Sequence, residues 1–245
     1  MMKGIDVAKW NGIIDWKKVK AAGVKFAVLK AINKSNKKED ALDRNYAGAT
    51  AQGLPLDVYN YLYTTTEAMA QEAAQAVVNA LAGRKVGKVW ADAEDACLKN
   101  KGILLIRILN TYKSVIEAAG YEFGVYTGLS FYNSYIKPYK DYIDCDFWIA
   151  RYPSTKDMTI DMDPIASKKP VICHNLWGWQ HSSRGRVHGI SGYVDLDICY
   201  TMVGSNGTVQ STTAYYPRYT GTSGSIVAAL NAVGVNSSYA TRKLI

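Results

Sequence analysis

The amino-acid sequence predicts an α/β fold, namely a (β/α) barrel with an irregular second half. Over the first half of the chain, short apolar segments alternate with longer amphipathic ones, the pattern of parallel strands joined by helices. A glycine closes each helical segment and marks where the helix ends. After residue 126 the apolar strands continue while the helical patterns fade. We therefore expect five βα units followed by three strands with little helix between them.

Local signals justify each predicted element. Asp15 is a suitable N-cap for the first helix, and a run of threonines precedes the third. The predicted strands are Gly4–Ala8, Lys25–Ile32, Leu56–Tyr63, Val86–Asp92, Glu122–Tyr126, Phe147–Arg151, one within Val171–Gln180, and Tyr193–Ile198. The predicted helices are Trp16–Ala22, Asp40–Gln52, Thr66–Leu81 and Ile103–Ala119. An open, doubly wound sheet is the alternative, but no phosphate-binding glycine motif follows the first strand, which disfavours a nucleotide site.

Composition divides the chain into three parts. Residues 1–204 contain all the predicted strands and form the barrel domain. The polar segment that begins Ser205-Asn206-Gly207 predicts a linker over residues 205–222. Residues 223–245 contain one short amphipathic helix, Ser223–Val233, which is too little chain for a core of its own. We interpret this last part as a partial C-terminal module.

The overall composition excludes several classes of protein. With 48% hydrophobic and 20% charged residues, the chain of 245 residues is typical of a soluble globular protein. No apolar run is long enough to span a membrane, so we expect no membrane insertion. Met1-Met2-Lys3 leads directly into a strand, so we also expect no signal peptide.

The chain is basic, with a formal net charge of +8 and an isoelectric point of about 9.1. Such a charge serves solubility or attracts a polyanion. The positive residues are scattered and no nucleic-acid-binding motif occurs, so we expect no nucleic-acid partner. An anionic bacterial wall polymer fits the charge equally well.

Cysteine and histidine show no metal-site spacing. The four cysteines are far apart without a CxxC pair, so we expect free, buried thiols, no zinc and no cofactor. The 18 tyrosines and six tryptophans are a more unusual feature. These rings combine an apolar face with a polar edge and stack on sugars, although packing must account for most of them.

The most informative segment is the predicted strand that runs into Asp92 and Glu94. Residues two apart on a strand project from the same face, so these two carboxyl groups point together while Asp95 points away. Two adjacent carboxyl groups cannot both ionise without a large free-energy cost, so one is pushed towards its protonated form. A protonated carboxylic acid beside a carboxylate is the arrangement that cleaves glycosidic bonds.

Other candidate residues also lie at predicted strand ends, where barrel enzymes place their catalytic groups. Asp6 is in the first strand, and Asp195 shares a face with Asp197 in the last. A lone strand acid is more often a capping or salt-bridge residue, but four acids on one rim are costly without a function. The full set is Asp6, Tyr61, Asp92, Glu94, Tyr126, Trp179, Gln180 and Asp195. No Gly-x-Ser-x-Gly segment or Cys–His pairing supports a nucleophilic triad.

Six segments in order resemble the glycoside hydrolase family 25 lysozymes, of the phage endolysin or autolysin type. They are Gly4–Trp16, Val89–Asp95, Phe123–Thr127, Phe147–Tyr152, Trp177–Gln180 and Gly192–Asp197, and they span most of Lys3–Tyr200. This chain departs from the family pattern at three places. Ala8 replaces a usual Ser, Asn60 replaces a frequent His, and Ile32-Asn33-Lys34 replaces a segment that often carries an acid.

The resemblance implies an irregular TIM-like barrel and a muramidase that cleaves the β-1,4 bond between N-acetylmuramic acid and N-acetylglucosamine in bacterial peptidoglycan. It implies Glu94 as proton donor, with Asp6, Asp92 and Asp195 as supporting acids. Substrate contacts are expected from Tyr61, Tyr126, Trp179, Gln180 and Asp197. It also makes the C-terminal part the start of a cell-wall-binding domain, and the site of action the bacterial wall, after release at lysis or secretion.

The role of Asp92 has two readings. Its negative charge raises the pKa of Glu94, or, as the resemblance implies, Asp92 or Asp195 orients the N-acetyl group of the substrate as the nucleophile. Two rival functions remain at this stage. One is a non-catalytic wall-binding protein on the same barrel, and the other is a chitinase-like glycosidase, whose motif usually carries an Asp where this chain has Trp90.

Overall fold

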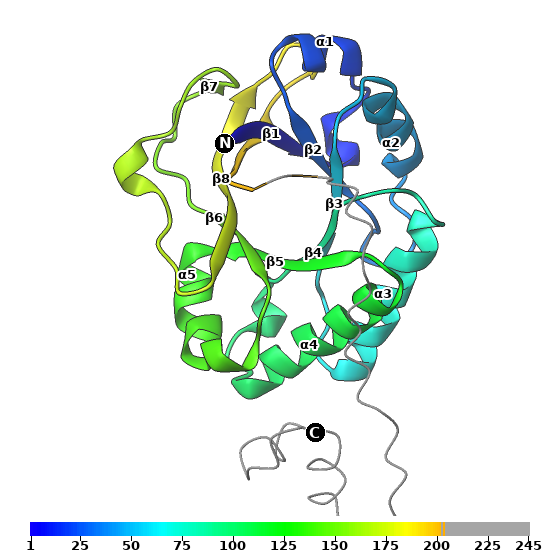
Figure 1. Cartoon of the computed structure of the whole chain (residues 1–245), viewed down its shortest axis with the longest axis vertical. Helices are drawn as coiled ribbons and strands as arrows, with labels where there is room; N and C mark the ends of the chain where they lie inside the picture. The colour runs from blue at the N-terminus through cyan, green and yellow to red at the C-terminus, as the bar shows by residue number, and fades with distance from the viewer. Residues whose placement is uncertain (202, 204–245) are drawn as a thin grey trace, which may run out of the picture. The chain divides into compact units, whose positions relative to one another are not determined.

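Eight strands close into a barrel in the computed structural model, which describes residues 1–201 and 203 (Figure 1). The strands lie in the order β6-β5-β4-β3-β2-β1-β9-β8, and pairing of β6 with β8 closes the ring. All run parallel except β9, which is antiparallel to both β1 and β8. Their bounds are β1 Met2–Val7, β2 Phe26–Lys30, β3 Leu56–Tyr61, β4 Lys88–Asp92, β5 Glu122–Gly128, β6 Asp146–Ala150, β8 Asn175–Arg186 and β9 Val194–Cys199. The predicted fold class is confirmed.

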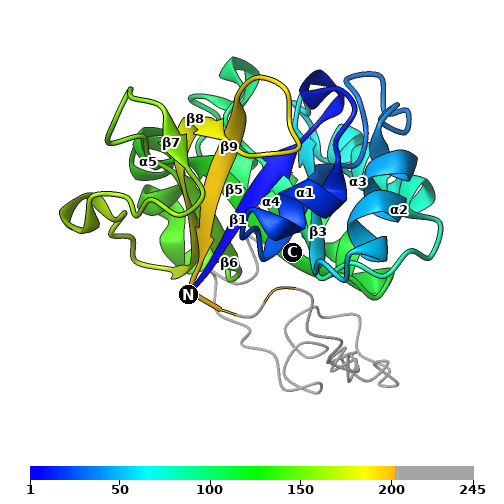
Figure 2. The same ribbon diagram turned by 90° about the horizontal axis from the view of Figure 1, so that it is seen from above.

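Regular helices cover only the first part of the barrel. They are α1 Trp16–Ala21, α2 Leu42–Ala51, α3 Glu67–Leu81 and α4 Ile103–Ala118, and they follow β1 to β4 in turn (Figures 1 and 2). Asp15 caps α1 by accepting the Lys18 N–H at 3.1 Å, and Thr66 caps α3 by accepting the Met69 N–H at 3.2 Å. In the described part of the chain, no helix has the length and apolarity needed to cross a membrane.

The second half is irregular, as the sequence predicts, but it contains elements that the sequence analysis missed. Short helical segments follow β5 and precede β8, and the two-residue β7 adds to the far end of β8. Strand β8 continues to Arg186, six residues beyond the predicted end, because its last part pairs with β9 in an antiparallel ladder. The missed elements of the second half are α5 Leu129–Phe131, the π-helix Tyr132–Ile136, the 3₁₀ segments Lys137–Tyr142 and Ala166–Lys168, and β7 Met158–Thr159. Two further 3₁₀ segments, Lys9–Asn11 and Ala96–Leu98, lie in the first half.

Large aromatic rings fill the lower part of the barrel. The rings of Trp90 and Trp177 lie 4.5 Å apart, and Trp148 packs edge-on against Trp90 at 5.8 Å. Gly124 lies next to Trp90 on the neighbouring strand β5, and a Cβ added there would meet the indole at 2.2 Å. The absence of a side chain there lets the indole fill the interior. These rings therefore fill the interior on the amino-terminal side of Asp92, the residue that ends β4.

Two expectations concern residues away from the barrel interior. The four cysteines are free, but Cys173 is exposed and only Cys199 is buried, so the expectation of buried thiols is wrong for most of them. The predicted linker 205–222 and partial module 223–245 lie outside the described residues.

Candidate active site

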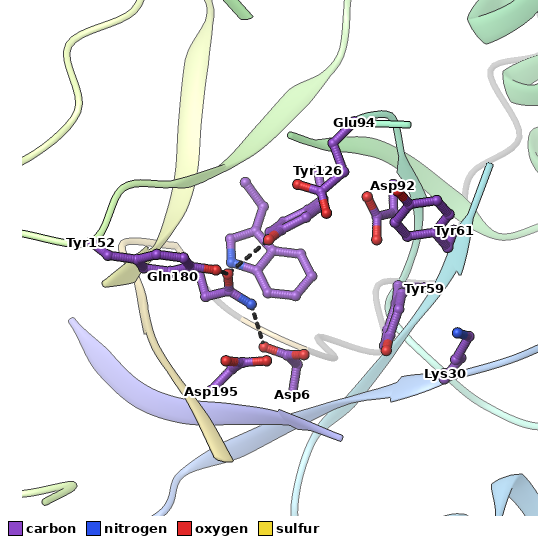
Figure 3. A pocket seen from close by; sticks show the side chains of 11 residues that line it. Asp6, Lys30, Tyr59, Tyr61, Asp92, Glu94, Tyr126, Tyr152, Gln180 and Asp195 are labelled. Atoms are coloured by element: carbon purple, nitrogen blue, oxygen red, sulfur yellow. Dashed lines mark hydrogen bonds between the residues drawn. The ribbon is translucent and has the colours of Figure 1, made fainter. Parts of the chain in front are cut away.

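A pocket of about 220 Å³ opens where the parallel strands end (Figure 3). The period of two along each strand brings alternate side chains inward, so each strand supplies one or two groups. Glu94 and Tyr152 lie on the loops that follow β4 and β6. The side chains that line the pocket are Asp6, Lys30, Tyr59, Tyr61, Asp92, Glu94, Tyr126, Trp148, Tyr152, Gln180 and Asp195.

The structure brings together the four acids selected from the sequence. Asp92 ends β4 and Glu94 follows it, and their carboxyl groups point towards one another (Figure 3). Asp6 on β1 pairs in register with Asp195 on β9, so these two acids lie side by side. Asp95 points away, because it accepts the Cys97 N–H at 2.8 Å and the Tyr61 hydroxyl at 3.2 Å.

Burial and proximity raise the pKa of both acids at the end of β4. Asp92 is 4% exposed, and burial followed by the charges of Glu94 and Asp6 raises its pKa well above the usual value. Glu94 is only partly buried, and burial and the charge of Asp95 raise its pKa. The sequence analysis expected the charge of Asp92 to raise the pKa of Glu94. In the structure the larger pKa increase is at Asp92, because Asp92 is the more deeply buried of the two.

Asp92 has an unusual feature besides its burial. Its Oδ1 is buried and has no hydrogen-bond partner within the part of the chain that the structure describes. A buried, unpartnered acceptor is costly in a free protein. Because the side chain faces the pocket, a donor on a bound ligand can satisfy it.

Asp6 on β1 is held by a hydrogen-bonded network. Gln180 Nε2 donates to Asp6 Oδ2 at 2.7 Å. Gln180 Oε1 accepts the Tyr126 hydroxyl at 2.7 Å and also the Tyr152 hydroxyl. Burial and the charge of Asp195 raise the pKa of Asp6 well above its usual value, and burial followed by the charge of Glu94 raises the pKa of Asp195 to about 6.

Two residues expected to contact substrate lie elsewhere. Asp197 is fully buried below the pocket, where its Oδ1 accepts the Trp148 indole N–H at 3.0 Å. Trp179 lies on the opposite face of β8 from Gln180, 1% exposed, and its indole N–H donates to the Arg151 carbonyl at 2.7 Å. Neither side chain lines the pocket, because Trp179 follows the register shift in the pairing of β6 with β8 and faces outward, and Asp197 lies deeper than Asp195.

Four pocket residues were missed by the sequence analysis. Lys30 lies two residues after the inward Val28, and Tyr59 two residues before Tyr61, so strict alternation along β2 and β3 could have identified both. The Lys30 charge lowers the pKa of Asp92 and partly offsets the effect of burial. The other two are Trp148 and Tyr152, and Tyr152 lies on a loop where no such period exists.

The chain is similar to carbohydrate-cleaving proteins over most of its length. Residues 5–190 match the family model described as Glycosyl hydrolases family 25. The uncharacterized protein YegX of Escherichia coli K12 is 26% identical over 217 residues, which cover 86% of this chain and 72% of the relative. The autolytic lysozyme of Clostridium acetobutylicum is 27% identical over 212 residues, covering 85% of this chain and 59% of the relative.

A solved structure supports the same relationship. The crystal structure of the CTP1L endolysin superposes with a TM-score of 0.64 and 25% sequence identity, covering 81% of this chain and 66% of that one. The chain thus spans under two thirds of the length of the autolytic lysozyme and about two thirds of that of the endolysin.

Proposed function

The chain belongs to the glycosyl hydrolases family 25, and we propose that it cleaves the β-1,4 bond between N-acetylmuramic acid and N-acetylglucosamine in bacterial peptidoglycan. Membership confirms the resemblance noted in the sequence and the expected class, a glycoside hydrolase. The observation that carries the proposal is the convergence of Asp6, Asp92, Glu94 and Asp195 on one pocket. Two similar proteins, an autolytic lysozyme and an endolysin, support the same substrate and action on the bacterial wall.

Glu94 is the proton donor in this proposal. Its raised pKa keeps it protonated at a higher pH than an exposed glutamate, as a general acid requires. It is also the more accessible member of its pair, since Asp92 is 4% exposed. Glu94 therefore donates its proton to the glycosidic oxygen as the bond to the sugar breaks.

Asp92 positions the substrate. Its unpartnered Oδ1 faces the pocket and can accept the N–H of the 2-acetamido group next to the scissile bond. That hydrogen bond would direct the acetamido oxygen towards the anomeric carbon, where positive charge develops. Across the pocket, Asp195 supplies negative charge once the pH exceeds its pKa of about 6. The half-buried ring of Tyr61 offers a face for sugar stacking, whereas Tyr126, 6% exposed, reaches Gln180 through its hydroxyl.

The decisive experiment compares the wild-type protein with Glu94→Gln on purified peptidoglycan. We expect the wild type to release reducing ends and the variant to lose activity about 10³-fold, because the amide cannot donate a proton in the same way. Borohydride reduction followed by acid hydrolysis identifies the new end, and muramitol is the expected product. Glu72→Gln, an exposed substitution on α3, is the matched control and should retain wild-type activity.

Other outcomes separate the rival functions. Glucosaminitol as the sole product would place the cleavage at the other glycosidic bond. Faster release of reducing ends from chitin than from peptidoglycan would indicate a chitinase-like enzyme. Binding to walls without any release of reducing ends by the wild type would indicate a non-catalytic wall-binding protein.

A further inference from the structure

Trp10 differs from every other tryptophan of the chain. All six tryptophans lie in the described part of the chain, and five of them are at most 5% exposed. Trp10 is 82% exposed. Exposing a ring of this size forgoes the favourable free energy that its burial would give. Neither the packing of the barrel nor the pocket chemistry described above uses it.

The loop that carries Trp10 is held in place on both sides. Asn11 Oδ1 accepts the Ala8 N–H at 2.9 Å, and Asn11 Nδ2 donates to the Tyr193 carbonyl at 3.2 Å. Arg44 donates to the Gly12 carbonyl at 2.8 Å from the neighbouring helix α2. The ring is therefore presented by a fixed backbone, which reduces the entropy that a ligand would lose on binding.

The same contacts place Trp10 beside the candidate active site. It lies four residues after Asp6, on the short helical segment that directly follows β1. Tyr193, to which the loop is tied, lies two residues before Asp195. Trp10 thus belongs to the rim between the strands that supply these two acids.

One face of the indole is already supported. The Lys9 ammonium lies 5.3 Å from the ring centroid and pairs with Asp40 at 3.2 Å. Because 82% of the residue is exposed, the opposite face is open to solvent. A single open aromatic face on a fixed loop is the geometry that receives the C–H face of a pyranose ring.

We propose that Trp10 forms an outer subsite that stacks on a 2-acetamido sugar of the glycan strand, beyond the sugars held in the pocket. The proposal rests on the proposed function, because the glycan strand of peptidoglycan is a polymer that extends from the pocket across its rim. Trp10 is a binding residue that takes no part in bond cleavage. It gives the enzyme a preference for long strands over short fragments.

Intrinsic fluorescence provides a direct test. In the folded protein, iodide reaches Trp10 while the other five indoles are buried, so iodide quenching reports on this residue. We expect peptide-free glycan strands to lower the quenching constant of the inactive Glu94→Gln variant at least about twofold, since a stacked sugar shields the ring. Trp10→Phe in the same background should lose most of the quenching signal, which verifies the assignment.

Kinetics separate this subsite from the catalytic pocket. For Trp10→Ala we expect KM on long glycan strands to rise roughly tenfold, with kcat and the KM of the shortest cleaved oligosaccharide unchanged. Trp10→Phe keeps an aromatic face and should recover most of the loss. The matched control is Val171→Ala, which removes another exposed apolar side chain, 86% exposed, four residues before β8 begins at the opposite end of the barrel.

The outcomes distinguish the two proposals. If the wild type cleaves peptidoglycan, but strands leave the quenching unchanged and Trp10→Ala leaves KM unchanged, the subsite is overturned and the proposed function stands. If the wild type releases no reducing ends, the proposed function fails, and protection of Trp10 by glycan strands then decides alone whether the rim binds them.

Discussion

The two acid pairs of the pocket differ in how the fold holds them. Asp6 and Asp195 lie on antiparallel neighbours, and Gln180 connects Asp6 to two tyrosine hydroxyls. Asp92 lies across the pocket at the end of a parallel strand, and its Oδ1 has no partner among the described residues. Both pairs contain raised pKa values, so titration alone does not distinguish them.

This difference indicates a division of roles. A carboxyl group whose oxygen already accepts a hydrogen bond from the protein gains little from a ligand at that oxygen. A buried oxygen without a partner gains the full free energy of a new hydrogen bond. We therefore assign substrate positioning and proton transfer to the Asp92–Glu94 pair, and the surrounding negative charge to the Asp6–Asp195 pair.

The largest expected effect that separates the pairs is on kcat. Asp92→Asn should lower kcat about 10²–10³-fold, because in the proposed role a neutral amide lacks the negative charge that stabilises the acetamido N–H as positive charge develops on the substrate. Asp6→Asn should lower kcat only about tenfold, because an amide oxygen can still accept the Gln180 N–H at the position of Asp6 Oδ2. Steady-state kinetics on purified peptidoglycan measures both.

Circular dichroism of both variants provides the control for folding. Equal losses in the two folded variants, or a larger loss in Asp6→Asn, would contradict the assignment of roles.

The strand pattern explains why the acids were predictable from the sequence. Asp92 and Glu94 could be identified as candidates because a buried strand rarely ends in two acids. Asp6 and Asp195 could be identified because each interrupts an apolar run. The barrel was predictable for a related reason: parallel strands and their helices repeat a local pattern with clear caps, such as Asp15 and Thr66.

The residues that were missed or misplaced depend on non-local geometry. Asp197 lies on the same strand face as Asp195. It is buried in the barrel interior, where it accepts the Trp148 indole N–H, and this contact cannot be read from the local sequence. Trp179 follows a register shift in the pairing of β6 with β8, which no local pattern reveals. Tyr152 reaches Gln180 from a loop, and its partner is 28 residues away in the chain.

Buried acids should make the folded state more stable at acidic than at neutral pH, and two of them carry the effect: Asp195 of the pocket, and Asp57 on β3, which lies outside both pairs and accepts the Trp90 indole N–H at 3.0 Å. Burial raises the pKa of Asp195 and of Asp57 to about 6, above the value of about 3.9 in an unfolded chain. A raised pKa contributes stability below the unfolded value and loses it as pH rises through the folded value. We expect the free energy of unfolding to fall by about 2–4 kcal/mol between pH 4.5 and 7.5, measured by denaturant titration.

Two variants connect this pH dependence to the pocket. Asp195→Asn should make the slope between pH 4.5 and 7.5 shallower, because one titrating group is removed. Asp141→Asn, whose side chain is 78% exposed, should leave the slope unchanged. Stability that is flat or rises over this range in the wild type would show that the interior acids remain ionised at little cost.

The smallest expected effect comes from removing the hydrogen bonds that Gln180 makes to Asp6 and the two tyrosines. Gln180→Leu removes the amide that joins Asp6 to the hydroxyls of Tyr126 and Tyr152, while a side chain of similar size still fills the space. Because Asp92 and Glu94 keep their own surroundings, we expect kcat/KM to fall only about tenfold, with most of the change in KM as the two tyrosines lose their fixed positions. Gln71→Leu, an exposed change on α3, is the matched control. A loss in kcat as large as that of Asp92→Asn would mean that the network around Gln180 holds a group that acts in the transition state, and the division between the two pairs would have to be abandoned.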